Sequence, residues 1–327
     1  MKINYISKFL LVSLFAIVVN SFIYFSFGNI YSSSVLNYTD FQNQFQSGIY
    51  QYRILSGYFL TFIHDFLSTS GIDYQLFKLK FTNDNAEPQM YLSFYLLNTG
   101  FLVLSGFVMN LITETKSFIA SESEKISLII IALFTIAISQ FVIVPYDVSS
   151  YFFLLVFFFF LIKYLEKSTP LYLLILGVLM VISTLNRESS ALSLSLMATV
   201  LYTKFGLKKE TIVPIAVLGF TFIAVYLGMR VMSENFSTND GNLFMENFSQ
   251  PKNFLGMLFW LLFFLFTLIL AKDKKAVRMI LIFHFLSLPY ILMCIYTGIL
   301  YEIRLYVPLF LTALFLGKTE FREKSKN

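Results

Sequence analysis

Long apolar runs separated by short polar segments recur along the whole chain. Most of these runs have a length near the roughly 17–25 residues that a helix needs to cross a bilayer. The pattern therefore predicts an all-α fold, a polytopic helical membrane protein with about ten transmembrane helices. We place these helices at about 9–27, 90–112, 126–144, 148–165, 170–186, 189–203, 211–229, 253–271, 279–299 and 303–317.

The composition excludes a water-soluble domain of this size. Hydrophobic residues make up 57% of the 327 residues and charged residues only 13%, so a soluble surface could not be formed. The 40 Phe and 20 Tyr residues suit lipid-facing and interfacial positions. The single cysteine, Cys294, lies within an apolar run, so disulfides are not expected.

Lysine and arginine are distributed unevenly between the polar segments. With the N-terminus inside, 17 of the 24 basic residues fall in inner segments. The seven outer basic residues are Arg53, Lys78, Lys80, Arg187, Arg230, Lys252 and Arg304. Because basic residues accumulate on the cytoplasmic side, we expect a multi-pass protein of the plasma (inner) membrane with both termini cytoplasmic. The net charge of +5 follows from this distribution, so no nucleic acid partner is expected.

We expect one transmembrane domain, 1–327, with two outer loops. The segment 28–89 is the longest polar region, and 231–252 forms a smaller outer loop. Within the first loop, 54–67 is apolar on one side but too short to cross a bilayer, which predicts helices lying at the membrane interface.

Four short polar segments interrupt the apolar pattern at predicted outer ends of helices. Charged groups at a membrane boundary are costly unless they are paired or wetted, so each segment is a candidate functional site. The segments are Gln51-Tyr52-Arg53, Pro145-Tyr146-Asp147, Asn186-Arg187-Glu188 and Glu302-Ile303-Arg304. Arginine outside is not explained by orientation, but bidentate binding of phosphate or carboxylate would explain it.

These segments, together with an acidic residue early in the first outer loop, Asp40, resemble multi-spanning glycosyltransferases of the GT-C type. The resemblance covers the layout of the whole chain and is nearest to bacterial enzymes of envelope polysaccharide or glycolipid assembly. It implies a sugar donor carried on polyprenyl phosphate, used at the outer face with a glycan or glycolipid acceptor. Membrane lipid is a further expected partner.

The reaction implied by the resemblance assigns roles to the outer residues. Asp40 matches the family's first-loop acid and is the candidate general base, with Asp147 second. Arg187 and Arg304 are candidates to hold the leaving phosphate, with Arg53 third. The remaining candidate substrate-binding residues are Tyr146, Glu188 and Glu302. Some family members carry paired acids for a metal, but no Asp-x-Asp occurs here, so no cofactor is expected and a divalent metal is the alternative.

Structural roles are the alternative interpretation of the same residues. Asp147 could cap a helix, and Asp40 could be an ordinary acid on a loop. Arg187 with Glu188, or Glu302 with Arg304, could be ion pairs that lock helix ends together. His284 lies in an apolar run and is expected to be a hydrogen-bonded core histidine.

Two other classes of function stay open from the sequence. Polysaccharide polymerases and ligases of the cell envelope are also polytopic and use outer arginines, but they usually need a large late outer loop. The loop 231–252 is modest for that role. A lipid-linked sugar transporter would need charges near mid-membrane or broken helices around a cavity, whereas the charges here lie at helix ends.

Overall fold

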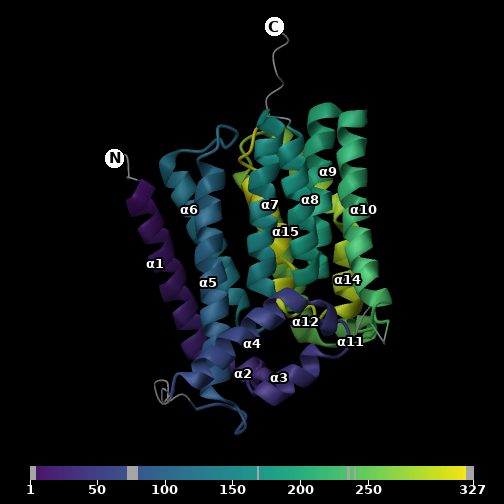
Figure 1. The fold of residues 1–327 in the computed structure, drawn as a ribbon. Helices are drawn as coiled ribbons and strands as arrows, with labels where there is room; N and C mark the ends of the chain where they lie inside the picture. The colour runs from purple at the N-terminus through teal and green to yellow at the C-terminus, as the bar shows by residue number, and fades with distance from the viewer. Residues whose placement is uncertain (1–4, 72–79, 168, 234–235, 239–240, 322–327) are drawn as a thin grey trace.

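The computed structural model describes residues 5–71, 80–167, 169–233, 236–238 and 241–321 (Figure 1). These residues form helices and no β-strand, and their one β-type pairing is an isolated antiparallel bridge between Phe118 and Thr319. The prediction of an all-α fold is therefore confirmed. Five of the basic residues used for orientation lie outside the described residues, namely Lys2, Lys78, Arg322, Lys324 and Lys326.

The helices follow one another with short connections. They are α1 (Tyr5–Ile23), α2 (Asn29–Tyr31), α3 (Tyr38–Phe45), α4 (Ile54–Thr69), α5 (Pro88–Thr113), α6 (Glu122–Ser139), α7 (Asp147–Lys167), α8 (Pro170–Asn186), α9 (Ala191–Phe205), α10 (Lys209–Val231), α11 (Phe244–Ser249), α12 (Pro251–Leu270), α13 (Lys274–Leu286), α14 (Leu288–Thr297) and α15 (Val307–Leu316). A π-helical turn, Tyr24–Gly28, extends α1, and 3-10 turns form at Ser33–Val35, Tyr50–Tyr52, Glu188–Ser190 and Ile303–Leu305.

Several of these helices can cross a membrane, as the sequence predicts. Among the described residues, five helical segments are long and apolar enough: Tyr5–Phe27, α5, α7, α10 and α12. The pair α13 and α14 passes the same test together but is bent by 49° at Ser287. The shorter apolar helices α8 and α15 also match predicted spans. The chain is therefore a helical membrane protein.

Burial separates an inner group of helices from an outer one. In its most apolar stretch, α5 is 61% buried and α7 is 56% buried, whereas α10 and α12 are only 11% and 17% buried. Every residue of α15 is buried. Apolar side chains that face outward all along α10 and α12 suit contact with lipid, because lipid tails are as apolar as a protein core.

Some helix boundaries differ from those the sequence predicts. The span predicted at 126–144 begins four residues earlier and ends at Ser139, because Ser121 and Glu124 form a capping box at its start. The span predicted at 279–299 is two helices, since Pro289 lies in the first turn of α14 and removes a backbone donor there. The span predicted at 303–317 begins as a 3-10 turn.

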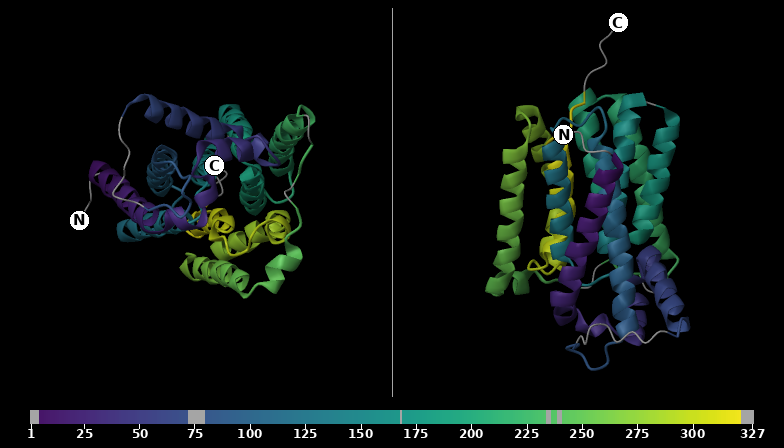
Figure 2. Two further views of the ribbon diagram at one scale, coloured as in Figure 1. Left: turned by 90° about the horizontal axis from the view of Figure 1, so that it is seen from below. Right: turned by 90° about the vertical axis from the view of Figure 1, so that its left-hand side faces the viewer.

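The bundle has two ends of different chemistry. We call one the lysine end, formed by the segments 114–121, 206–208, 271–273 and 317–320, which backbone hydrogen bonds such as Lys272 N–H to Gly317 O join together. We call the other the arginine end, formed by 46–53, 140–146, 187–190 and 298–306. Helices α3 and α4, from the predicted outer loop, lie at the arginine end, at the bottom of Figure 1 and of the right-hand view in Figure 2.

Candidate functional site

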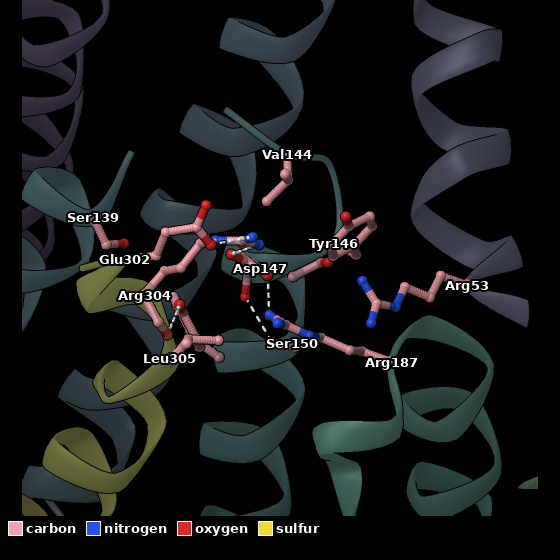
Figure 3. Close-up of polar contacts among 12 residues, drawn as sticks. Arg53, Ser139, Val144, Tyr146, Asp147, Ser150, Arg187, Glu302, Arg304 and Leu305 are labelled. Carbon is pink, nitrogen blue, oxygen red and sulfur yellow. Dashed lines mark hydrogen bonds and ion pairs between the residues drawn. The ribbon is translucent and has the colours of Figure 1, made fainter. Parts of the chain in front are cut away.

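Asp147 is the centre of an ionic cluster at the arginine end (Figure 3). It is the first residue of α7 and has no exposed surface. Its Oδ1 accepts a hydrogen bond from Arg187 Nη1, and its Oδ2 accepts one from Arg304 Nη1 at 3.0 Å. A fully buried carboxylate is stable only when its charge is compensated, and here two guanidinium groups compensate it.

Arg304 extends the cluster toward the N-terminal part of the chain. It lies in the 3-10 turn before α15, and its Nε donates to Glu302 Oε2 at 2.8 Å. The other oxygen of Glu302 accepts a hydrogen bond from the Tyr31 hydroxyl at 3.0 Å. Glu302 is 5% exposed, so this chain of contacts links residues 271 positions apart within a buried setting.

A second ion pair lies beside the first. Arg53 donates from Nε and Nη2 to the two oxygens of Glu188, at 3.1 and 2.5 Å, which is a bidentate contact. Burial alone would raise the pKa of the Glu188 carboxyl, but the Arg53 guanidinium outweighs it and lowers that pKa to about 2. Glu188 is therefore ionised at neutral pH.

Tyr146 joins the two ion pairs. Its ring lies 4.4 Å from the guanidinium carbon of Arg53 and 5.5 Å from that of Arg187. The ring of Tyr50 also lies beside Arg53, at 5.1 Å. Stacking on an aromatic face favours a cation in a desolvated site, so the ring holds both guanidinium groups in place.

Asn186 fixes the backbone around the cluster. It is the last residue of α8, and its Oδ1 accepts hydrogen bonds from Ser56 of α4 at 2.5 Å and Ser149 of α7 at 3.0 Å. Its Nδ2 donates to the backbone oxygen of Tyr146 at 3.2 Å. One buried amide thereby connects three helices and positions both neighbours of the Asp147–Arg187 pair.

The structure brings together seven of the eight residues predicted for the site. They are Arg53, Tyr146, Asp147, Arg187, Glu188, Glu302 and Arg304. The predicted pairing of Glu302 with Arg304 occurs, but Arg187 pairs with Asp147 and Glu188 pairs with Arg53. Neighbours in the sequence therefore take partners on different helices.

Asp40 is not part of this cluster. It is exposed, in the first turn of α3, where its backbone N–H donates to the cap residue Asn37 at 3.2 Å. Its carboxylate makes no hydrogen bond or ion pair with any residue that the structure describes. Helix α3 packs against the 3-10 turn that precedes Arg53, so Asp40 and the cluster share one end of the molecule.

The cluster is electrically balanced, with three arginines and three carboxylates. The sequence gave no signal for Tyr31 and Tyr50, whose roles depend on long-range contacts. Arg230 is a further buried cation at this end, 2% exposed, with Tyr226 and Tyr52 rings at 3.6 and 4.3 Å. It has no carboxylate partner among the described residues, and its Nη2 has no hydrogen-bond partner.

Two cavities adjoin the cluster. A small one of about 10 Å³, enough for one water molecule, is lined mainly by serines. Its serines are Ser150, Ser183, Ser189, Ser190 and Ser193. The other is an apolar groove of about 330 Å³ between α6 and α12, lined by residues that include Phe134 and Phe266. Both walls of this groove contact the 3-10 turn that carries Arg304.

No group of three or more histidine, cysteine, aspartate or glutamate side chains could hold a metal ion within the part of the chain that the structure describes. His284 donates to or accepts from its own helix, with Nδ1 2.9 Å from Ile280 O, as predicted for a core histidine. Comparisons with protein families, with curated proteins and with solved structures find no match for this chain.

Proposed function

We propose that this chain is a membrane glycosyltransferase that moves a sugar from a polyprenyl-phosphate donor to an envelope glycan or glycolipid acceptor. The observation that carries the proposal is the buried arginine–carboxylate cluster at one end of an apolar bundle, beside a groove that faces lipid. A lipid-linked phosphate needs both features at once, because its headgroup is anionic and its tail is apolar. The cluster and the groove meet at Arg304.

The proposal includes ten membrane crossings. The apolar helices α1, α5, α6, α7, α8, α9, α10, α12, the bent pair α13–α14, and α15 would alternate in direction between the lysine end and the arginine end. The lysine end would face the cytoplasm of the inner membrane, and α3 and α4 would lie at the outer interface.

Orientation can be tested with cysteines placed at the two ends. After Cys294→Ala, a cysteine introduced by Ser47→Cys at the arginine end should react with a membrane-impermeant thiol reagent added to intact cells. A cysteine introduced by Lys274→Cys should react only after the cells are opened. Both positions are exposed, so access to the reagent depends on the side of the membrane alone. Reversed labelling would overturn the orientation and the outer-face reaction with it.

In the proposed reaction, an acceptor hydroxyl attacks the anomeric carbon of the donor sugar. A carbon–oxygen bond to the acceptor forms, the bond between that carbon and the phosphate oxygen breaks, and the hydroxyl proton passes to a carboxylate. The leaving polyprenyl phosphate keeps the electron pair, so negative charge grows on its oxygens. Guanidinium groups placed at that point would stabilise the transition state.

The contacts of the two candidate acids favour Asp40 over Asp147 as the base. Both oxygens of Asp147 are occupied by arginines, which oppose the uptake of a proton. Asp40 is exposed and its carboxylate is free to accept one. Asp147 then serves to hold Arg187 and Arg304 in position.

Arg304 is the best placed of the three cluster arginines to meet the phosphate. Its side chain is 13% exposed, compared with 7% for Arg53 and 9% for Arg187. The apolar groove between α6 and α12 leads to the turn that carries it, which suits a polyprenyl tail. Arg230 supplies a nearby positive charge that no described carboxylate neutralises.

The Asp40→Asn variant tests the proposed function. It keeps the shape of the side chain but cannot accept the proton, so sugar transfer from a polyprenyl-phosphate donor should fall by about 10²–10⁴-fold. The measurement is turnover by purified protein in detergent or vesicles with a panel of such donors. Folding should be unchanged, because the side chain is exposed.

Asp84→Asn is the matched control, since Asp84 is an exposed acid of the same predicted outer loop. It should leave turnover unchanged. Full specific activity in Asp40→Asn would pass the role of base to another group. Absence of donor consumption by wild-type protein with every donor would count against the glycosyltransferase function.

A transporter of lipid-linked sugars is the second candidate, because of the break between α13 and α14. Broken helices often form the substrate sites of transporters. The break lies near the cluster, since Tyr290 of α14 donates to Leu305 O at 2.9 Å. Movement of intact donor across vesicles without transfer of its sugar would favour this function.

A further inference from the structure

A separate basic pocket lies at the lysine end, between the last turn of α9 and the first turns of α13. It has a volume of about 380 Å³. Its lining residues are Tyr202, Thr203, Gly206, Lys275, Arg278 and Ile282. A side-chain carbon added at Gly206 would meet no other atom within 4 Å, so the pocket is open at the end of α9.

The two cations of this pocket are uncompensated. Lys275 and Arg278 are one helical turn apart on α13, and both are exposed. The carboxylates nearest in the sequence and at this end, Asp273 and Glu320, pair with Lys272 instead. No ion pair joins Lys275 or Arg278 to a carboxylate within the described residues. Two free cations on one wall of a pocket form a site for an anion.

The opposite wall offers a neutral donor. Tyr202 is 37% exposed, and its hydroxyl makes no hydrogen bond with any described residue. A tyrosine hydroxyl can donate to a phosphate oxygen, while the guanidinium of Arg278 can bind two oxygens of the same group. The pocket therefore combines one hydroxyl donor with two positive charges.

Below the pocket, the outward face of α13 is apolar. Leu281, Phe285 and Leu288 follow Arg278 at helical spacing and are 47%, 69% and 41% exposed. In a membrane, this stripe would lie against acyl chains directly beneath the two cations. A soluble phosphate ester would have no use for such a stripe, whereas a phospholipid would fill both parts.

We propose that this pocket binds the headgroup of an anionic phospholipid, with its acyl chains along α13. Basic pockets between transmembrane helices at a cytoplasmic surface bind such headgroups. The site is at the opposite end of the bundle from the ionic cluster and does not depend on the proposed glycosyltransferase reaction.

The test compares the wild-type chain with the double variant Lys275→Gln/Arg278→Gln. Each protein, purified in neutral detergent, is titrated with dioctanoyl phosphatidylglycerol, and bound lipid is counted by native mass spectrometry. Each basic side chain contributes about a factor of five near an anionic lipid surface, so the double variant should bind on the order of 25-fold more weakly. Arg278→Lys keeps the charge and should lose only a small part of the affinity.

The double variant Lys208→Gln/Lys209→Gln is the control. It removes two exposed charges from the same end, outside the pocket, and should bind the lipid like the wild type. Phosphatidylcholine should not bind to the pocket in any variant. Equal binding of phosphatidylglycerol by the wild type and by Lys275→Gln/Arg278→Gln would overturn the proposal. Competition by glycerol 3-phosphate at the same concentration as the lipid would overturn the assignment to a phospholipid and indicate a soluble phosphate ester.

Discussion

The two ends of the bundle pair their charges in opposite ways. At the lysine end, Lys318 bonds to Glu124 at 3.0 Å, and the glutamate side chain is 49% exposed. At the arginine end, Asp147 is 1% exposed at its side chain and lies between Arg187 and Arg304. Both ends carry ion pairs, but only those of the arginine end are withdrawn from water.

This difference determines how much each pair contributes. Exposed pairs contribute about 0–1 kcal/mol, because water screens them and two long side chains must be held in place. Loss of one partner from a buried pair costs about 3–5 kcal/mol, because the other charge remains buried and uncompensated. Lysines suffice to orient the chain in the membrane, whereas planar guanidinium groups suit the desolvated, multiply bonded cluster.

The largest effect is expected for Asp147→Asn. Asparagine has nearly the same shape but no charge, so two guanidinium groups lose their common partner. We expect the free energy of unfolding to fall by about 3–5 kcal/mol, measured by SDS titration of the purified protein in detergent micelles. Wild-type stability in this variant would mean that the cluster is hydrated and would remove the contrast between the two ends.

Arg53→Lys should have an intermediate effect. Lysine keeps the charge but loses the bidentate contact with Glu188 and the stacking on Tyr146. The loss of a hydrogen bond between charged groups predicts a decrease of about 1.5–3 kcal/mol in the same titration. The control is Arg278→Lys at the lysine end, which breaks no ion pair and should leave stability unchanged. Equal stabilities for the two variants would contradict the prediction.

The smallest effect is expected for Glu124→Gln. It removes the charge that faces Lys318, but glutamine can still complete the capping box with Ser121. The free energy of unfolding should change by less than about 1 kcal/mol. A loss as large as that of Asp147→Asn would show that exposed pairs are as important as the buried cluster.

The sequence was sufficient to predict the class of fold and the gathering of the polar segments. Apolar runs near bilayer length predicted the all-α membrane fold, and the placement of arginines at helix ends singled out residues that now lie together. Both signals are local, since each depends on residue type and position along one segment. They therefore survive without knowledge of the packing.

Partners and bends could not be predicted in the same way. Arg187 and Glu188 are adjacent in the sequence, but the backbone at Arg187 is extended, with φ −165° and ψ 143°, and the two side chains diverge to different helices. The break at Ser287 depends on how α13 and α14 pack, which the unbroken apolar run conceals. Tyr31 was missed because only a contact across 271 positions involves it with Glu302.

The balance of three arginines against three carboxylates also bears on how fast a charged ligand arrives. Equal and opposite charges held within a few ångströms cancel at a distance, so the cluster projects little field beyond about one Debye length, roughly 8–10 Å. A ligand would be attracted only on contact with the site. For a molecule anchored in the bilayer this is sufficient, because diffusion in the plane of the membrane delivers it to the groove without electrostatic guidance.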